Sequence, residues 1–183
     1  MPAPQKLAHV VLTTNQIDAM TKWYCTVLSA RIQHQSEVAT FLTYDEEHHR
    51  IALAQIDGAQ QPQEGSTGLS HIAFTFDDLD GLLTTFAELR DEGITPHWTV
   101  NHGTTSSLYY ADPDHNLVEL QVDNFATAEE GNEYLRSEQF AANPIGVRFE
   151  PEQYLKRLRS GESSAELIEE LARVEGEPVG PPA

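Results

Sequence analysis

The sequence has one cysteine, no long apolar run and few basic side chains, and each shortage argues against one class of protein. Cys25 has no second cysteine with which to form an internal disulfide, and 183 residues can bury a core without one. No apolar stretch approaches the roughly 20 residues that a membrane-spanning helix needs. The 11 Lys and Arg stand against 29 Asp and Glu, and the net charge of -18 would repel nucleic-acid phosphates and anionic lipids. We therefore expect a globular protein that binds neither nucleic acid nor a membrane. The first residues, MPAPQKLAHV, lack the pattern of a signal peptide, which predicts a cytoplasmic location.

The chain contains an internal repeat. Placing KLAHVVLTT beside GLSHIAFTF aligns His9 with His71, 62 positions later. The apolar and polar positions that follow keep the same register in both copies. We therefore predict two modules of one architecture, at about 6–56 and 68–125, which form one domain over residues 1–125.

The residue pattern of each module predicts one helix and four strands in the order βαβββ. A short β-rich run comes first, and an Asn or Asp turn then leads into apolar positions at helical spacing, from Ile17 to Leu28 and from Leu79 to Leu89. The remaining runs have the length and composition of strands. These runs are about 30–36, 38–45, 49–56, 94–101, 105–111 and 116–122. The fold class is therefore α+β, with paired βαβββ modules.

Two segments lie outside this pattern. Residues 57–67 are rich in Gly, Pro and Gln and are interpreted as a linker between the modules. Residues 126–183 predict a helical extension that packs on the domain or on a subunit interface. Its expected helices are about 127–141, 151–160 and 163–174, and we expect its Pro- and Gly-rich end to fray.

Three side chains have the types and positions of a metal-binding set. His9 and His71 occupy matching places in matching strands, so packing of the two modules would bring them to symmetry-related positions. Alternation in the last strand places Glu119 on one face with Leu117 and Gln121, where a carboxylate is costly unless it is paired or binds a metal. Two imidazoles and one carboxylate match the facial triad of non-haem Fe(II) oxygenases. Mn(II) accepts similar ligands and zinc is also compatible. The alternative is two core histidines bonded to backbone groups and a glutamate that faces water.

The repeat also predicts how many protein ligands there are. Sliding IALA onto LVEL places Leu53 opposite Glu119, so the first module supplies no matching carboxylate. Three protein ligands would leave room for a bidentate substrate together with a small molecule.

The motifs resemble a known superfamily over residues 6–125. LAHVVL, HHRIAL, LSHIAF and NHGTTSSLYYADPDHNLVELQVDNF are similar to the vicinal oxygen chelate superfamily, and within it to the one-domain type I extradiol dioxygenases. That resemblance implies paired modules that form an open, barrel-like metal site. The tail ANPIGVRFEPEQYLKRLRSGE resembles the extension of one-domain members that act on dihydroxybiphenyl-like substrates.

The resemblance also implies a role for each site residue. The three side chains named above correspond to the iron ligands. His49 corresponds to the acid–base histidine, and Tyr109 to the tyrosine that hydrogen-bonds the bound catecholate. His102 falls near a position that helps to hold O2. His49 could instead be a solvated residue of the charged run DEEHHR, and Tyr109 a packed strand aromatic. His48 would face away from His49 in an extended strand.

The implied activity is Fe(II)-dependent extradiol (meta) cleavage of a catechol-type aromatic diol by O2, and a homo-oligomer is expected. One departure from the family pattern is His115, where a glycine is usual in a turn that favours positive φ. Two alternatives remain within the superfamily. One is a metal-free, antibiotic-binding protein. The other is a glyoxalase-type lyase or isomerase, which draws carboxylates from both modules, so Leu53 argues against it.

Overall fold

The computed structural model describes residues 1–60 and 67–180, and the chain divides into two compact units. Unit 1 comprises Met1–Leu69 together with Asp112–Asn116, and unit 2 comprises Ser70–Ala111 and Leu117–Ala183. Each unit contains one β-sheet with helices, so the predicted α+β class is confirmed. Residues 61–66 of the predicted linker and residues 181–183 of the tail lie outside the described residues. Among the residues that are described, no helix is long and apolar enough to cross a membrane.

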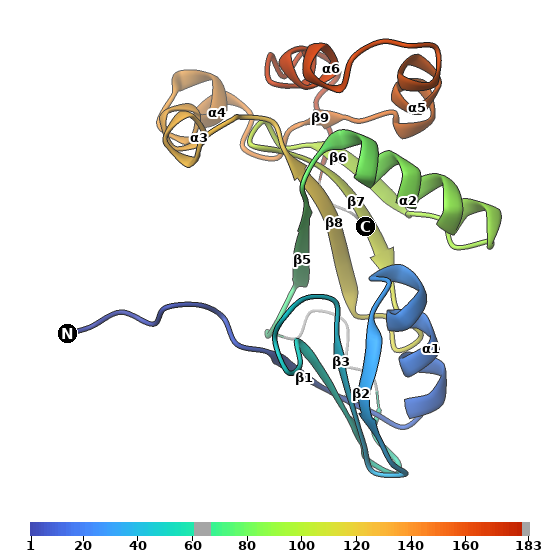
Figure 1. Ribbon diagram of the computed structural model, residues 1–183. Coiled ribbons are helices and arrows are strands. Elements are labelled where there is room, and N and C mark those ends of the chain that lie inside the picture. Colours follow the sequence, from blue (N-terminus) through green and yellow to red (C-terminus); the bar gives the residue numbers. More distant parts are fainter. Residues whose placement is uncertain (61–66, 181–183) are drawn as a thin grey trace. The chain divides into compact units, whose positions relative to one another are not determined.

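Unit 1 has the predicted βαβββ order (Figure 1). Its elements are β1 (Val10–Thr14), α1 (Ile17–Val27), β2 (Arg31–Gln35), β3 (Ala39–Thr43) and β4 (Ile51–Gln55). The sheet order is β1-β4-β3-β2, with β1 and β4 parallel and the other neighbours antiparallel. Helix α1 packs on β3 and β4.

Unit 2 repeats this plan and adds to it. Its elements are β5 (His71–Phe76), α2 (Leu79–Asp91), β6 (Trp98–Asn101), β7 (Thr105–Ala111), β8 (Leu117–Asp123) and the added strand β9 (Val147–Arg148). The sheet order is β5-β8-β7-β6-β9, and β5 and β8 are parallel, as β1 and β4 are in unit 1. The repeat seen in the sequence is therefore a repeat of sheet topology.

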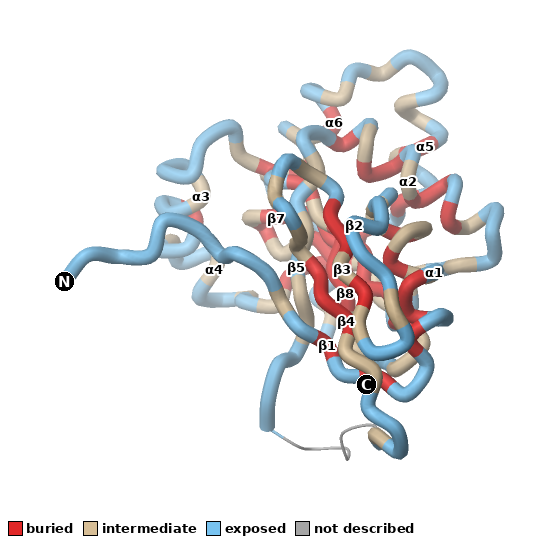
Figure 2. Tube along the Cα trace, turned by 60° about the horizontal axis from the view of Figure 1, so that its bottom comes forward, coloured by how far each residue is buried: buried red, intermediate tan, exposed pale blue. Residues whose placement is uncertain are grey.

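The helical periodicity identified the core correctly. Met20 and Tyr24 of α1 are fully buried, as are Leu82 and Leu83 of α2. Figure 2 shows buried segments along both helices. Burying side chains of this size contributes about 1.5–3 kcal/mol each relative to leaving them exposed. One face of each sheet is thereby covered by its own helix.

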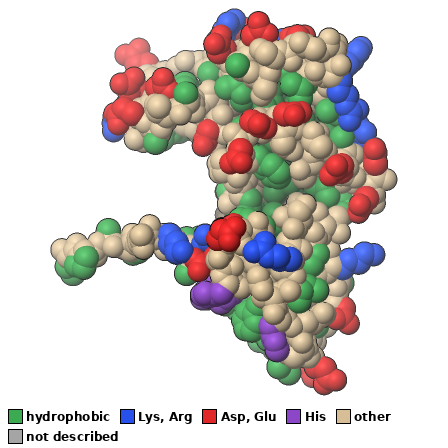
Figure 3. Space-filling model, in the orientation of Figure 1, with side chains coloured by type: hydrophobic (Ala, Val, Ile, Leu, Met, Phe, Trp, Pro, Cys, Tyr) green, Lys and Arg blue, Asp and Glu red, His purple; other side chains and the backbone are tan. Residues whose placement is uncertain are grey.

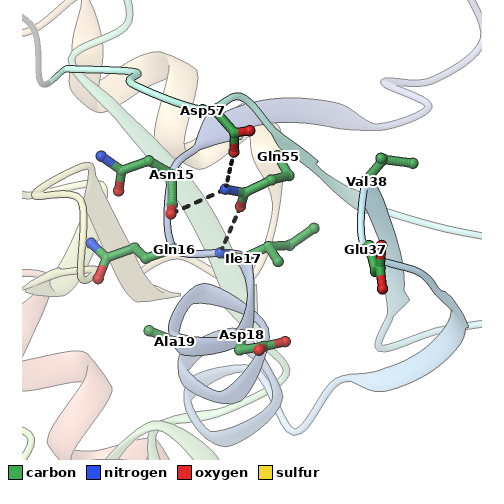
Figure 4. A pocket seen from close by; sticks show the side chains of 9 residues that line it. All are labelled: Asn15, Gln16, Ile17, Asp18, Ala19, Glu37, Val38, Gln55 and Asp57. Carbon is green, nitrogen blue, oxygen red and sulfur yellow. Dashed lines mark hydrogen bonds between the residues drawn. The ribbon is translucent and has the colours of Figure 1, made fainter.

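A hollow lies at the start of α1, where a side chain from the end of β4 caps the helix (Figure 4). The Gln55 side chain accepts a hydrogen bond from the Ile17 backbone N–H and donates to the Asn15 carbonyl and to Asp57. The first of these bonds satisfies a backbone N–H at the helix N-terminus, where the N-cap residue Gln16 makes no side-chain hydrogen bond. The other two hold the Gln55 side chain in place. None of the predicted site residues lines this hollow.

The extension differs from its prediction in two places. Its helices are α3 (Ala128–Leu135), α4 (Glu138–Ala142), α5 (Pro151–Arg159) and α6 (Ser164–Leu171), and α5 and α6 pack on α2. The single helix predicted at 127–141 is wrong, because Ser137 caps a new helix by accepting from the Phe140 N–H. The predicted fraying of the end is wrong for residues 177–179. Arg148 N–H donates to the Glu177 carbonyl, and Val179 N–H donates to the Gly146 carbonyl.

Charge is spread over the surface without a basic stripe on the face in view. In Figure 3 acidic side chains are scattered over many elements, while Lys and Arg occur in small separate groups. This distribution agrees with a formal net charge of -18.

Candidate metal centre

One face of the unit 2 sheet brings Glu119 and His71 together. In the strand register, Glu119 of β8 lies between Ala73 of β5 and Tyr109 of β7. His71 comes two residues before Ala73 on the same strand, and alternation places it on the same face. Its Nε2 lies 3.0 Å from Glu119 Oε2. The repeat and the strand alternation therefore pointed to two side chains that are in direct contact.

Glu119 has the surroundings of a cation ligand. Its side chain is only 5% exposed, and a buried carboxylate is costly unless it is paired or bound to a metal. Among the described residues, its ion-pair partners are two histidines, His71 at 3.0 Å and His102 at 4.0 Å. An imidazole balances this charge only when it is protonated. The donor set of imidazole nitrogen and carboxylate oxygen fits a divalent metal of the first transition row.

Tyr109 and His102 continue this cluster along the sheet. The Tyr109 hydroxyl lies 3.0 Å from His102 Nε2, and Trp98 packs beside both rings, with centroids 4.7 Å and 5.6 Å away. Burial raises the pKa of the Tyr109 phenol, and the nearby Glu119 carboxylate raises it further. The phenol therefore keeps its proton near neutral pH and can act as a hydrogen-bond donor.

Unit 1 presents a second cluster around His9. The His9 and His49 rings are 4.4 Å apart between centroids, and Phe41 lies 5.0 Å from His49. Burial, followed by the neighbouring His9 and His48, lowers the pKa of His49. Since the side chain of His48 is 72% exposed, His49 is the member of the pair that packs against His9.

Arg50 holds the segment that leads into His9. Its guanidinium donates to the carbonyls of Leu7 and Ala8 and pairs with Asp45 at 2.9 Å. The hydrogen bond from Arg50 lowers the pKa of Asp45 to about 2, so the pair stays charged over the physiological range. One guanidinium thus connects the loop before β4 to the segment that carries His9.

The strand register corrects one prediction. In unit 2, Glu119 pairs with Ala73, and in unit 1 the position that matches Ala73 is Val11, which pairs with Ala52. Ala52, rather than the predicted Leu53, is therefore the counterpart of Glu119. The prediction failed because the apolar strings IALA and LVEL align equally well in two registers. The conclusion that the first module offers no matching carboxylate is unchanged.

The predicted metal ligands fall on both units. His9 lies in unit 1, and His71 and Glu119 lie in unit 2. Within the described residues, no three His, Cys, Asp or Glu side chains are grouped closely enough to hold a metal ion. The complete triad therefore stays a prediction.

One further prediction about these segments is confirmed, and two residues of the clusters were missed. His115 has φ +63°, so the turn adopts the positive φ that the glycine pattern indicated. Trp98 and Arg50 were missed. Arg50 stands inside the quoted motif HHRIAL, and its place directly after His49 was the available signal.

Comparison with known proteins gives a consistent family. The family model for the Glyoxalase/Bleomycin resistance protein/Dioxygenase superfamily matches residues 6–120. The chain is 47% identical over 152 residues to Biphenyl-2,3-diol 1,2-dioxygenase 2 of Rhodococcus globerulus, covering 82% of this chain and 80% of the relative. It is 46% identical over 169 residues to Biphenyl-2,3-diol 1,2-dioxygenase 3 of the same organism, covering 91% and 89%. The crystal structure of a glyoxalase/dioxygenase from Nostoc punctiforme shares the fold, with a TM-score of 0.57 at 18% identity over 67% of this chain and 96% of that one. The chain therefore belongs to the Glyoxalase/Bleomycin resistance protein/Dioxygenase superfamily.

Proposed function

We propose that this protein is an extradiol dioxygenase that uses O2 to open the ring of a catechol-type diol similar to biphenyl-2,3-diol. The observation that carries the proposal is the 47% and 46% identity to two biphenyl-2,3-diol 1,2-dioxygenases, along 80% and 89% of their lengths. In that name the attacked carbons are 1 and 2 and the hydroxyl groups are on 2 and 3, so cleavage occurs beside the diol. These relatives confirm the dioxygenase class predicted from the motifs. They favour it over the metal-free binding protein and the glyoxalase-type enzyme.

We further propose that the catalytic metal is Fe(II), held by His9, His71 and Glu119. The contact between His71 and Glu119 supports two of these ligands, and the burial of Glu119 supports a cation beside it. For His9, the support is its match to His71 in the repeat and its exposed position immediately before β1. Mn(II) would accept the same ligands, so the metal has to be identified by measurement.

The remaining residues of the two clusters have distinct tasks in this proposal. Fe(II) held by these residues would supply open coordination positions for the diol and for O2. His49 removes a proton from one diol hydroxyl and later returns it, and its lowered pKa keeps it neutral and able to accept at pH 7. Tyr109 hydrogen-bonds a diol oxygen and orients the ring. His102 holds the Tyr109 hydroxyl from the other side. A His49→Phe variant with full turnover would remove His49 from this scheme.

The test is anaerobic reconstitution of the purified chain with Fe(II) or Mn(II), followed by air and a panel of diols. Biphenyl-2,3-diol is expected to give a yellow ring-fission product. The signal should disappear in His9→Ala, His71→Ala and Glu119→Ala. His97→Ala is the matched control, because His97 is exposed and lies in none of the motifs. Absence of both metal uptake and product would contradict the proposal.

A further inference from the structure

The turn that carries His102 is built from buried amides. Asn101 Oδ1 accepts hydrogen bonds from the Gly103 backbone N–H and from Asn124 Nδ2. Asn124 also donates to the Gly103 carbonyl. These groups are all buried, and a buried, fully paired amide network specifies one geometry. The backbone on both sides of His102 is therefore held rigidly.

The C-terminal extension contacts this turn at two further points. Asn101 Nδ2 donates to the carbonyl of Leu171, the last residue of α6, at 2.7 Å. Tyr134 of α3 packs directly on Gly103, where a Cβ atom would overlap its ring. Helices that are far apart in the extension thus meet at a single turn of the sheet.

A third contact reaches the His102 side chain itself. His102 Nδ1 lies 2.5 Å from the carbonyl oxygen of Ile145. This approach requires Gly146, which has φ +120° and whose Cβ would overlap the backbone oxygen of Asn101. Asn143 holds the same bend, because its side chain accepts from the Gly146 N–H and donates to the Gly146 carbonyl.

The chemistry of these partners determines where the His102 proton lies. A carbonyl oxygen can only accept, so the nitrogen that faces Ile145 must carry the proton. In neutral His102, Nε2 is then an acceptor, and the bond to Tyr109 runs from the phenol hydroxyl to Nε2.

We propose that the extension positions the dioxygenase site: the Ile145 carbonyl, presented by Asn143 and Gly146, holds His102 in its Nδ1–H tautomer and thereby orients the Tyr109 hydroxyl. This inference rests on the proposed function, which gives Tyr109 its task. Asn143, Ile145 and Gly146 are positioning residues and do not touch substrate. The helices of the extension serve as the support for that bend.

The first test is the tautomer of His102 in the full-length, metal-free protein, read from the imidazole signals in a long-range 1H–15N correlation spectrum. A His102→Gln variant assigns the signals. We expect a protonated Nδ1 and an unprotonated Nε2 at neutral pH. The opposite tautomer, or an even mixture, would overturn the proposal without any variant.

The second test compares Asn143→Ala and Gly146→Ala with Gly161→Ala. Gly161 lies in the same extension at φ +102° with open space around it, so its substitution reproduces the backbone strain without the overlap at the turn. Asn143→Ala loosens the bend without adding an atom, so it serves where Gly146→Ala fails to fold. For Asn143→Ala and Gly146→Ala we expect a mixture of His102 tautomers and a roughly fivefold lower kcat with little change in KM. This decrease corresponds to the loss of about one neutral hydrogen bond. Gly161→Ala should keep the wild-type tautomer and a kcat within twofold.

The outcomes separate the two proposals. Folded Asn143→Ala with the wild-type tautomer and kcat would refute the role of the extension, whatever the substrate is. If the wild-type protein cleaves no diol, the proposed function fails, and the tautomer measurement still decides whether the extension holds His102.

Discussion

Replacing Tyr109 with Phe removes one hydroxyl from the centre of the unit 2 cluster and leaves the ring in place. In the structure this hydroxyl lies 3.0 Å from His102 Nε2, and in the proposed function it also bonds a diol oxygen. The ring remains packed against Trp98. The variant therefore separates the hydrogen bonds from the packing.

The expected loss follows from the bonds removed. Because its one proton is donated to His102 Nε2, the Tyr109 oxygen accepts from the diol hydroxyl that is not ionised. A neutral hydrogen bond of this kind contributes about 0.5–1.5 kcal/mol, and each 1.4 kcal/mol is a factor of ten. The kcat/KM of Tyr109→Phe for biphenyl-2,3-diol should therefore fall roughly 2- to 12-fold. The free energy of unfolding should fall by only about 1 kcal/mol, because His102 is half-buried and water can replace part of the lost bond.

Tyr110→Phe is the matched control. Tyr110 follows Tyr109 on the same strand, faces the other side of the sheet and is fully buried. Its hydroxyl has no hydrogen-bond partner among the described residues. Removing that hydroxyl should leave kcat/KM unchanged and raise the free energy of unfolding by about 1 kcal/mol. The assay records product absorbance under steady-state conditions and urea unfolding of each variant. Equal kcat/KM values for Tyr109→Phe and the wild type would refute the role given to the phenol.

Three further changes test the ligands, the β7–β8 turn and the extension. Glu119→Gln should weaken Fe(II) binding by at least about tenfold in a chelator competition, because the charged ligand is lost, and unchanged affinity would remove Glu119 from the site. His115→Asn should raise the free energy of unfolding by up to about 1 kcal/mol in urea, since Asn tolerates φ +63° better, and a decrease would show that His115 makes a compensating contact. The hydrogen bond from Arg157 holds the pKa of Glu170 below its ordinary value of 4.5. The ion pair therefore stabilises the folded protein fully above pH 4.5, and this stabilisation disappears as the pH falls through the lowered pKa of folded Glu170. The melting temperature of wild type should therefore exceed that of Glu170→Gln at pH 7 and equal it in acid, and a constant difference would contradict this.

The repeated sheet topology was predictable because each element carries its own pattern. The helical faces around Met20 and Leu82 and the alternation around Glu119 are local properties of the chain, and the structure follows them. The family and the dioxygenase class were predictable from the motifs for the same reason.

Features that depend on pairing between distant segments were harder to predict from the sequence. Strand β9 has two residues and exists because it pairs with β6 and with the segment around Glu177. Ala52 was mistaken for its neighbour because the register of a buried apolar strand is decided by its partner strand. The contact from Ile145 to His102 uses a backbone carbonyl, which every residue type has, so no sequence pattern marks it.

The methyl group of Ala52, in the register position that Glu119 occupies in the other unit, has a consequence for charge balance. The proposed ligands carry one negative charge in total, so a divalent ion at the site would keep one positive charge. A singly ionised diol would bring the assembly to neutrality, whereas a second carboxylate at position 52 would have neutralised it beforehand. Attraction for an anionic ring would thus depend on the absence of a carboxylate at position 52.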